Sequence, residues 1–364
     1  MSMINTWKRY ASKGKTEQQL LLADAYWNGK SVKKDYKLAV KWYLIAAKKG
    51  EKEAQLRMGE AYYFGFGVTK SFAHAARWYE MAANQGVVAA QTILGDCYFF
   101  GTGVERNYKS AVNWYSKAAE QGDASAEFAI GNCYYYGNGV MQDFVEANNH
   151  YYKSAMKNNA AAQFALGDAY YWGEGVIKNY DTAADWYVLS AKQNDSDAQF
   201  ALGDAYYWGE GVEQDYTKAI QWYKLSADQG DDVAQYYLAN AYFTGTGVAV
   251  NRKKAYELYK LSAMQGNQDA TFSLATAYFE GEGVKPNAKK AVALYFKNAK
   301  AGHIDSASAL GQAFFSGRGV RKDMKEALAW YKYAAKNGDQ EAIQVLEMLE
   351  WLKAEENKNK SWSK

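Results

Sequence analysis

The sequence predicts an all-α solenoid of nine 36-residue helix pairs with half-repeat caps, and three observations predict it. A loop glycine returns every 36 residues without an insertion, at Gly29, Gly65, Gly101, Gly137, Gly173, Gly209, Gly245, Gly281 and Gly317. The stretch ALGDAYYWGEGV occurs twice in this phase, at 165–176 and 201–212. The chain has a single proline, Pro286, and no linker-like segment. A fixed period of this length is typical of stacked repeats rather than separate domains.

One repeat, residues 122–158, shows how each element is specified. Asp123 can cap a first helix, helix A, with the sequence ASAEFAIGNCYYY, and Gly137 ends it in a left-handed conformation. Asp143 then caps a second helix, helix B, which Asn158 closes. Apolar residues fall on one face of each helix, at Ala126, Ile130, Cys133 and Tyr134 in helix A and at Ala147, Tyr151 and Ala155 in helix B.

The residues at the ends of helix B recur in the same way. Its N-cap is a strong cap former in all nine repeats: Asp35, Ser71, Asn107, Asp143, Asn179, Asp215, Asn251, Asn287 and Asp323. Its stop is glycine or asparagine, the residues that best tolerate a positive φ: Gly50, Gly86, Gly122, Asn158, Asn194, Gly230, Gly266, Gly302 and Gly338.

The phase extends beyond the nine full repeats and gives the predicted domain boundaries. Residues 1–14 read as an N-terminal half-repeat and capping helix, and 15–338 as the nine repeats. Residues 339–356 read as a capping helix that covers the last apolar face, and 357–364 as a disordered basic tail. The total is 20 helices.

Composition excludes several classes of function. The net charge is +3 with both signs mixed, so we expect no nucleic-acid partner. No stretch approaches the roughly 20 apolar residues of a membrane span, and the N-terminus has no signal peptide. We therefore expect a cytoplasmic protein that does not insert into membranes and is monomeric unless a partner is bound. Signal-independent secretion stays open.

The residues that could carry chemistry do not form a site in the sequence. The G-x-G loop joins two helices and lacks the strand or the GK[ST] ending that a phosphate site needs. His74, His150 and His303 have no metal-ligand spacing, and Cys97 and Cys133 occupy a slot that is alanine elsewhere. We therefore expect no catalytic residue, no cofactor, no metal and no enzymatic activity.

The repeat pattern resembles the Sel1-like repeat family, a relative of tetratricopeptide repeats. It is read in Ala162, Leu166, Gly167, Tyr170, Gly173, Gly175, Val176, Asn179, Ala183, Trp186, Tyr187 and Ala191, and the resemblance covers about 14–350. It implies a right-handed α/α superhelix that acts as an adaptor or scaffold, as in many bacterial members. Departures are Ser31 at the second loop glycine and His150, Leu258 and Leu294 at the tryptophan.

Helix A ends in three positions that suggest a binding surface. The first two are aromatic in every repeat and are interpreted as packing. The third reads Asn28, Phe64, Phe100, Tyr136, Trp172, Trp208, Thr244, Glu280 and Ser316, so the fold does not require an aromatic ring there. Five rings in register predict an exposed contact strip.

A second stripe lies earlier on helix A and is predicted to line a concave groove, with Asp96 as a further acidic member. Its members are Phe128, Asn132 and Tyr135; Phe164, Asp168 and Tyr171; Phe200, Asp204 and Tyr207; Tyr236, Asn240 and Phe243. The alternative is that these rings pack between repeats and the carboxylates only solvate the surface.

The leading hypothesis is a scaffold that binds a protein partner along this aromatic and acidic groove. It includes a bacterial immunity protein that neutralises a toxin effector and a regulatory adaptor. The alternative hypothesis is a module that binds glycans or peptidoglycan fragments.

Overall fold

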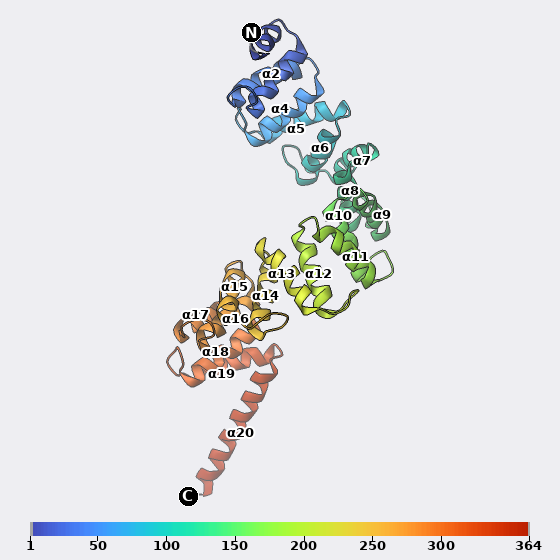
Figure 1. The fold of residues 1–364 in the computed structure, drawn as a ribbon. Coiled ribbons are helices and arrows are strands. Elements are labelled where there is room, and N and C mark those ends of the chain that lie inside the picture. Colours follow the sequence, from blue (N-terminus) through green and yellow to red (C-terminus); the bar gives the residue numbers. More distant parts are fainter. Residues whose placement is uncertain (1–2, 363–364) are drawn as a thin grey trace. The chain divides into compact units, whose positions relative to one another are not determined.

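The computed structural model describes residues 3–362, with side chains described through Leu352. Within these limits the chain forms twenty α-helices and no strand (Figure 1). The helices are α1 Met3–Ser12, α2 Thr16–Asn28, α3 Tyr36–Ala47, α4 Lys52–Phe64, α5 Phe72–Asn84, α6 Val88–Phe100, α7 Tyr108–Glu120, α8 Ala124–Tyr136, α9 Phe144–Ala155, α10 Ala160–Trp172, α11 Tyr180–Ala191, α12 Ser196–Trp208, α13 Tyr216–Asp228, α14 Asp232–Thr244, α15 Arg252–Met264, α16 Gln268–Glu280, α17 Ala288–Lys300, α18 Ile304–Ser316, α19 Met324–Lys336 and α20 Gln340–Trp362.

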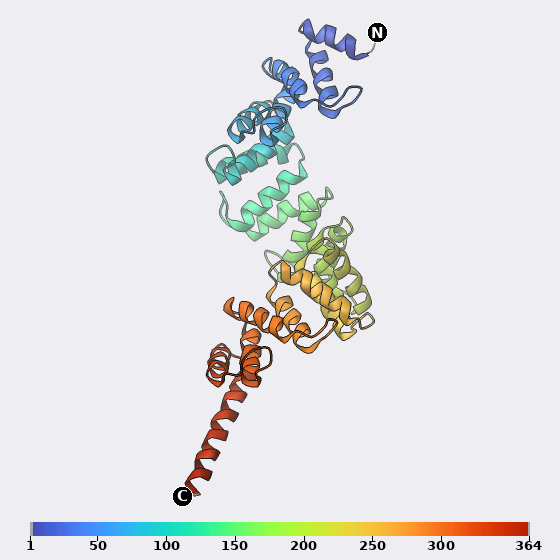
Figure 2. The ribbon, with the colours of Figure 1, turned by 90° about the vertical axis from the view of Figure 1, so that its left-hand side faces the viewer.

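The helices pack in chain order, as expected for an α/α solenoid. Even-numbered helices α2–α18 are the A helices of the nine repeats, and odd-numbered helices α3–α19 are the B helices. Apart from α11, where the chain divides, each helix contacts its neighbours in the chain, α2 with α3 and α3 with α4 for example, as Figures 1 and 2 show. The chain divides into two compact units within α11, Met1–Trp186 and Tyr187–Lys364, and each is described by itself.

The predicted helix ends are confirmed. The N-cap side chain of every B helix accepts a hydrogen bond from a backbone N–H two or three residues later, at 2.9–3.4 Å. All nine residues predicted to stop the B helices have a positive φ, and Asn158 and Asn194 fill this position at 63° and 68°. These caps fix where each helix starts and ends, and so fix the period.

Alanine, leucine and tyrosine side chains form the core between the helices of a repeat. In repeat 3, Ala90 and Leu94 of α6 and Ala111, Tyr115 and Ala118 of α7 are all buried. A glycine in helix A lets the tyrosine of helix B approach closely. In repeat 6, a Cβ at Gly203 would lie 2.5 Å from the Tyr223 ring, so alanine does not fit there.

The second loop glycine holds neighbouring repeats together. A Cβ at Gly175 would lie 2.6 Å from the carbonyl oxygen of Phe144, the first residue of the preceding B helix. The loop therefore rests directly on the backbone of the repeat before it. Repeat 1 has Ser31 in this position, with φ 67°.

The two ends of the chain are single helices. Helix α1 lies within residues 1–14, where an N-terminal half-repeat is predicted, and buries Ile4 and Ala11. Helix α20 continues past Glu356 to Trp362, where the sequence analysis expects a disordered tail over 357–364. The side chains from Lys353 onward and residues 363–364 lie outside the described part. Of the helices that are described, none combines the length and hydrophobicity that a membrane span requires.

Candidate protein-binding surface

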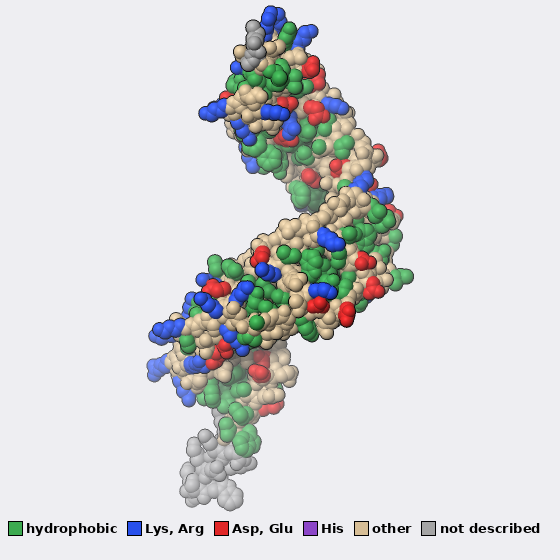
Figure 3. Space-filling view, in the orientation of Figure 1, with side chains coloured by type: hydrophobic (Ala, Val, Ile, Leu, Met, Phe, Trp, Pro, Cys, Tyr) green, Lys and Arg blue, Asp and Glu red, His purple; other side chains and the backbone are tan. Residues whose placement is uncertain are grey.

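The third-position rings of helix A are exposed. Phe64, Phe100, Tyr136 and Trp172 in the first unit are 58–70% exposed, and Trp208 in the second unit is 60% exposed. We call these five residues the ring set. The polar residues that fill this position in the other repeats are exposed too. Apolar side chains interspersed with charged ones are visible on the surface of both units in Figure 3.

Each ring of the ring set packs against one aromatic ring, which in turn packs against a second. Trp172 lies edge-on against Tyr171 at 4.8 Å between centroids, and Tyr171 lies edge-on against Tyr180, the first residue of α11, at 5.1 Å. The same triad recurs at Phe64, Phe100, Tyr136 and Trp208, with centroid distances of 4.8–5.2 Å. Edge-to-face contacts of this kind are favourable, so the exposed rings are fixed in position before any partner binds.

The aromatic residues of the second stripe are less exposed. Phe128, Phe164, Phe200 and Tyr236 are partly buried, and so are Tyr171 and Tyr207. The ring of Phe128 lies 5.6 Å from that of Tyr151, and Phe200 lies 5.7 Å from Tyr223 and 5.6 Å from Tyr237 of the next repeat. These contacts are within and between repeats, which is the packing role that the sequence analysis keeps as the alternative.

The polar residues of the second stripe bind the core tyrosines of helix B. Tyr115 donates to Asp96 at 2.7 Å, and Tyr223 donates to Asp204 at 2.5 Å. Tyr151 and Tyr259 donate in the same way to Asn132 at 2.8 Å and Asn240 at 2.6 Å. Asp168, the corresponding residue of repeat 5, is partly buried. These side chains therefore tie helix A to helix B besides being accessible from the surface.

Burial changes the titration of two of these carboxyls. It raises the pKa of Asp96 and raises the pKa of Asp204 to about 6, although the tyrosine hydrogen bond opposes the shift in both cases. A carboxylate that is poorly hydrated is stabilised by any cationic group that approaches it. Both positions therefore favour a cationic contact.

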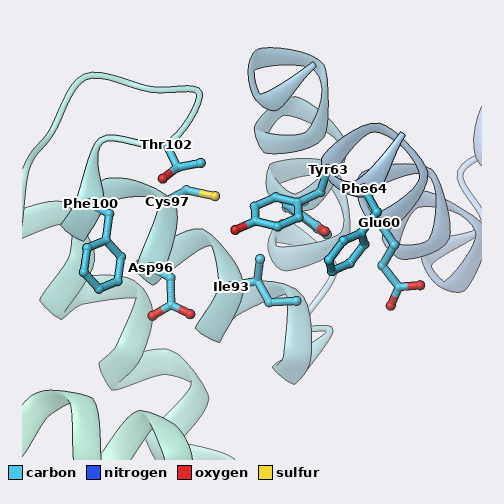
Figure 4. Close-up of a pocket in the computed structure, with 9 residues that line it drawn as sticks. Glu60, Tyr63, Phe64, Ile93, Asp96, Cys97, Phe100 and Thr102 are labelled. Atoms are coloured by element: carbon cyan, nitrogen blue, oxygen red, sulfur yellow. The ribbon is translucent and has the colours of Figure 1, made fainter. Parts of the chain in front are cut away.

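The ring set and these carboxylates share a face in the first unit. Phe64, Phe100, Glu60 and Asp96 all line one pocket between α4 and α6 (Figure 4). Glu60 accepts from Arg57 at 2.8 Å. Aromatic faces and carboxylates therefore meet on the same surface there.

Histidine and cysteine form no catalytic or metal-binding arrangement in the described residues. His74 stacks on Tyr62, His150 pairs with Glu127, and His303 caps α18. Cys97 and Cys133 are buried, and burial raises the pKa of their thiols to about 11 and about 12. No group of three or more His, Cys, Asp or Glu side chains in the described part is placed to hold a metal ion.

Two kinds of polar residue are missing from the sequence-based site. A glutamine of helix A is buried in six repeats and donates to a carbonyl of the preceding B helix, as Gln55 does to Ala47 at 3.2 Å. In repeat 4 this position is Glu127, which pairs at 2.7 Å with His150 in the tryptophan slot. In repeat 4 the glutamine is replaced by Glu127 and the tryptophan by His150, and this pair of changes within one repeat is the sequence signal for the contact. The other missed group is the tyrosines of helix B that donate to the polar residues of the second stripe. In each of these pairs the tyrosine lies 19 residues after its acceptor.

A family model for the Sel1 repeat matches the chain nine times, over residues 19–51, 52–87, 88–123, 124–159, 160–195, 196–231, 232–267, 268–303 and 304–339. A search of the curated proteins finds no match. Among solved structures, the chain is similar to a protective antigen of uropathogenic Escherichia coli strains with an SLR fold, at 34% identity, a TM-score of 0.60 and coverage of 94% of this chain and 81% of that one.

Two further structures are similar over different lengths. A Sel1 repeat protein from Oxalobacter formigenes is 28% identical, with a TM-score of 0.61 and coverage of 85% of this chain and 89% of that one. An immunity protein from Pseudomonas aeruginosa is 22% identical, with a TM-score of 0.40 and coverage of 59% of this chain and 81% of that one. The nine matches span the chain from residue 19 to residue 339, and the chain therefore belongs to the Sel1 repeat family.

Proposed function

We propose that this protein is a non-enzymatic scaffold that binds a protein partner through the ring set. Sel1 repeats form interaction scaffolds rather than catalytic folds. The observation that carries the proposal is a contrast at the end of helix A. The aromatic residues in the first two positions are packed, whereas those of the ring set in the third position are exposed. Since four repeats have Asn, Thr, Glu or Ser in the third position, folding does not account for rings in the other five.

The ring set has the properties of an energetic anchor for binding. Trp and Tyr dominate the residues that contribute most to protein interfaces, and large exposed apolar surface marks contact sites. The edge-on triads hold the rings in place, so little conformational entropy is lost when a partner covers them. The partly buried stripe supports them: Phe128, Phe164, Phe200 and Tyr236 pack beneath the surface, and Asp96, Asp168 and Asp204 supply acceptors for donors of the partner.

Charge indicates the kind of partner surface that fits. The carboxylates of the stripe favour a partner with basic or amide donors next to an apolar patch. A toxin effector neutralised by an immunity protein and a target of a regulatory adaptor are two versions of this proposal. The identity of the captured protein distinguishes them.

The test removes rings without disturbing the fold. The double variant Trp172→Ala with Trp208→Ala should keep its helicity and melting temperature and should lose the partner in affinity purification followed by mass spectrometry. The matched control is Leu189→Ala with Leu225→Ala, which removes two exposed apolar side chains of B helices, 45% and 44% exposed. We expect the control to capture the same partner as the unchanged protein.

Two outcomes contradict the proposal. If the tryptophan variant unfolds, the rings are part of the core. If both variants capture the partner equally well, binding occurs elsewhere. Retention on cell-wall material that depends on the two tryptophans, with no protein captured, would instead support the glycan alternative.

A further inference from the structure

The tyrosine of helix B is hydrogen bonded to helix A in most repeats. Its hydroxyl pairs with an Asp, Asn or Thr of the same repeat in Tyr43–Asp24, Tyr115–Asp96, Tyr151–Asn132, Tyr223–Asp204, Tyr259–Asn240 and Tyr295–Thr276. Repeats 2 and 9 differ because the helix A residue is Glu60 or Gln312, which is one methylene longer than Asp or Asn. Neither Glu60 nor Gln312 accepts a hydrogen bond from Tyr79 or Tyr331, although these tyrosines are only 2% and 5% exposed.

The residue one turn earlier on helix A is also smaller than phenylalanine in both repeats. In repeats 4 and 6, Phe128 and Phe200 pack against the tyrosine of helix B. Repeat 2 has Leu56 at this position and repeat 9 has Ser308, both smaller than phenylalanine. A pocket lined by Tyr79 is found in repeat 2, and a pocket lined by Ser308, Gln312 and Tyr331 is found in repeat 9. A pocket therefore lies beside an unpaired tyrosine in each unit.

The pocket of repeats 2 and 3 is the one that joins the ring set. Its volume is ≈ 330 Å³, which suits one long side chain. Tyr63 and Phe64 of α4 form one wall, and Asp96 and Phe100 of α6 lie on the other, as Figure 4 shows. Thr102, in the loop after α6, closes one edge.

The lining favours a positive charge at the end of an aliphatic chain. Glu60 and Asp96 are the charged residues that line the pocket, and both are acidic. Glu60 is paired with Arg57, whereas Asp96 makes no ion pair in the described structure and uses Oδ1 for Tyr115. Its other oxygen, Oδ2, can accept from a cation, and the faces of Tyr63, Phe64 and Phe100 attract cations as well. The unpaired Tyr79 hydroxyl offers a further acceptor.

We propose that this pocket is an anchor site for a basic side chain, arginine or lysine, of the protein partner. The inference rests on the proposed function, because it names the group that the partner inserts between Phe64 and Phe100. The guanidinium or ammonium group contacts Asp96 and Tyr79, and the aliphatic stem lies along Ile93 and the aromatic walls. Binding of the cation also favours the ionised form of Asp96, whose pKa burial raises.

The test uses small probes and needs no partner. N-acetyl-arginine N-methylamide is titrated into the full chain, labelled with ¹³C at isoleucine δ methyl groups, and the Ile93 methyl shift is followed by NMR. N-acetyl-citrulline N-methylamide is the neutral probe of nearly the same shape. We expect the arginine probe to bind about tenfold or more tightly than the citrulline probe, since hydrogen bonds to charged groups exceed neutral ones by this margin. The buried Ile130 methyl is the internal reference.

Three variants assign the effect to the pocket. Asp96→Asn keeps an acceptor for Tyr115 and should remove most of the preference for arginine. Tyr79→Phe loses no hydrogen bond of the fold and should weaken binding of the arginine probe severalfold. Glu120→Gln removes the same charge from an exposed position of α7 outside the pocket and should leave the titration unchanged.

Equal affinity for the two probes, or an arginine preference that survives Asp96→Asn, would overturn the inference. Such a result concerns the pocket alone, because the ring set is tested separately by partner capture. Conversely, if the tryptophan variant still captures the partner while the pocket binds the arginine probe selectively, the proposed function fails and the pocket inference stands. The two failures are therefore distinguishable.

Discussion

Removal of one tyrosine hydroxyl should cost stability in repeat 3 and nothing in repeat 2. In Tyr115→Phe, Asp96 loses the donor at 2.7 Å, which comes from a tyrosine side chain that is almost fully buried. A hydrogen bond to a charged group contributes about 1.5–3 kcal/mol, so we expect a loss of about 2 kcal/mol. In Tyr79→Phe, no bond within the fold is lost, and we expect a change below about 0.5 kcal/mol.

The assay must be local because repeats of a solenoid can open separately. Hydrogen exchange of the amides in α6 and α7, followed by mass spectrometry, should become about 30-fold faster in Tyr115→Phe, which corresponds to 2 kcal/mol. Exchange in α4 and α5 should be unchanged in Tyr79→Phe. If the two variants lose protection equally, the distinction between a paired and an unpaired hydroxyl is wrong, and the anchor pocket loses its main support.

Two further predictions concern the loops and pH. Gly175→Ala places a side chain at a positive φ and against the Phe144 carbonyl, so it should destabilise the junction of α9 and α10 by about 3 kcal/mol. Ser31→Gly removes a side chain from a residue with positive φ and should stabilise repeat 1 by about 0.5–1 kcal/mol. Hydrogen exchange measures both changes. Burial raises the pKa of Asp204 to about 6, above the value of about 3.9 for an unfolded chain, so the folded state binds the proton more tightly. The free energy of unfolding should therefore fall as pH rises from about 4 to about 6, and Asp204→Asn, which keeps an acceptor for Tyr223, should flatten this dependence in urea titrations. An unchanged slope in Asp204→Asn would show that another group is responsible.

The fold could be predicted because its signals are local and repeated. Each helix end depends on one cap residue and one residue with positive φ, and both kinds of residue can be recognised in the sequence. The period then fixes the pairing of the helices, since a repeat contacts only its neighbours. The exposure of the ring set followed from the same comparison, because Asn28 and Ser316 show that the third position does not require a ring.

The polar contacts of the site could not be predicted in the same way. Whether Asp96 faces solvent or a tyrosine depends on how helix A is rotated against helix B, which the spacing alone does not specify. The difference between Asp96 and Glu60 is one methylene, and its effect on Tyr79 becomes visible only when both helices are in place. The Glu127–His150 pair is similar, since neither change is explained without the other.

The contact between each loop and the B helix before it also gives the chain a direction of assembly. The backbone on which Gly175 rests belongs to residues that the ribosome has already made and released when that glycine emerges. A repeat whose loop makes this contact therefore meets a completed docking surface during synthesis and can fold without waiting for the C-terminus. An insertion that kept whole 36-residue blocks would preserve this sequence of events, whereas one that broke the phase would leave a loop with nothing beneath it.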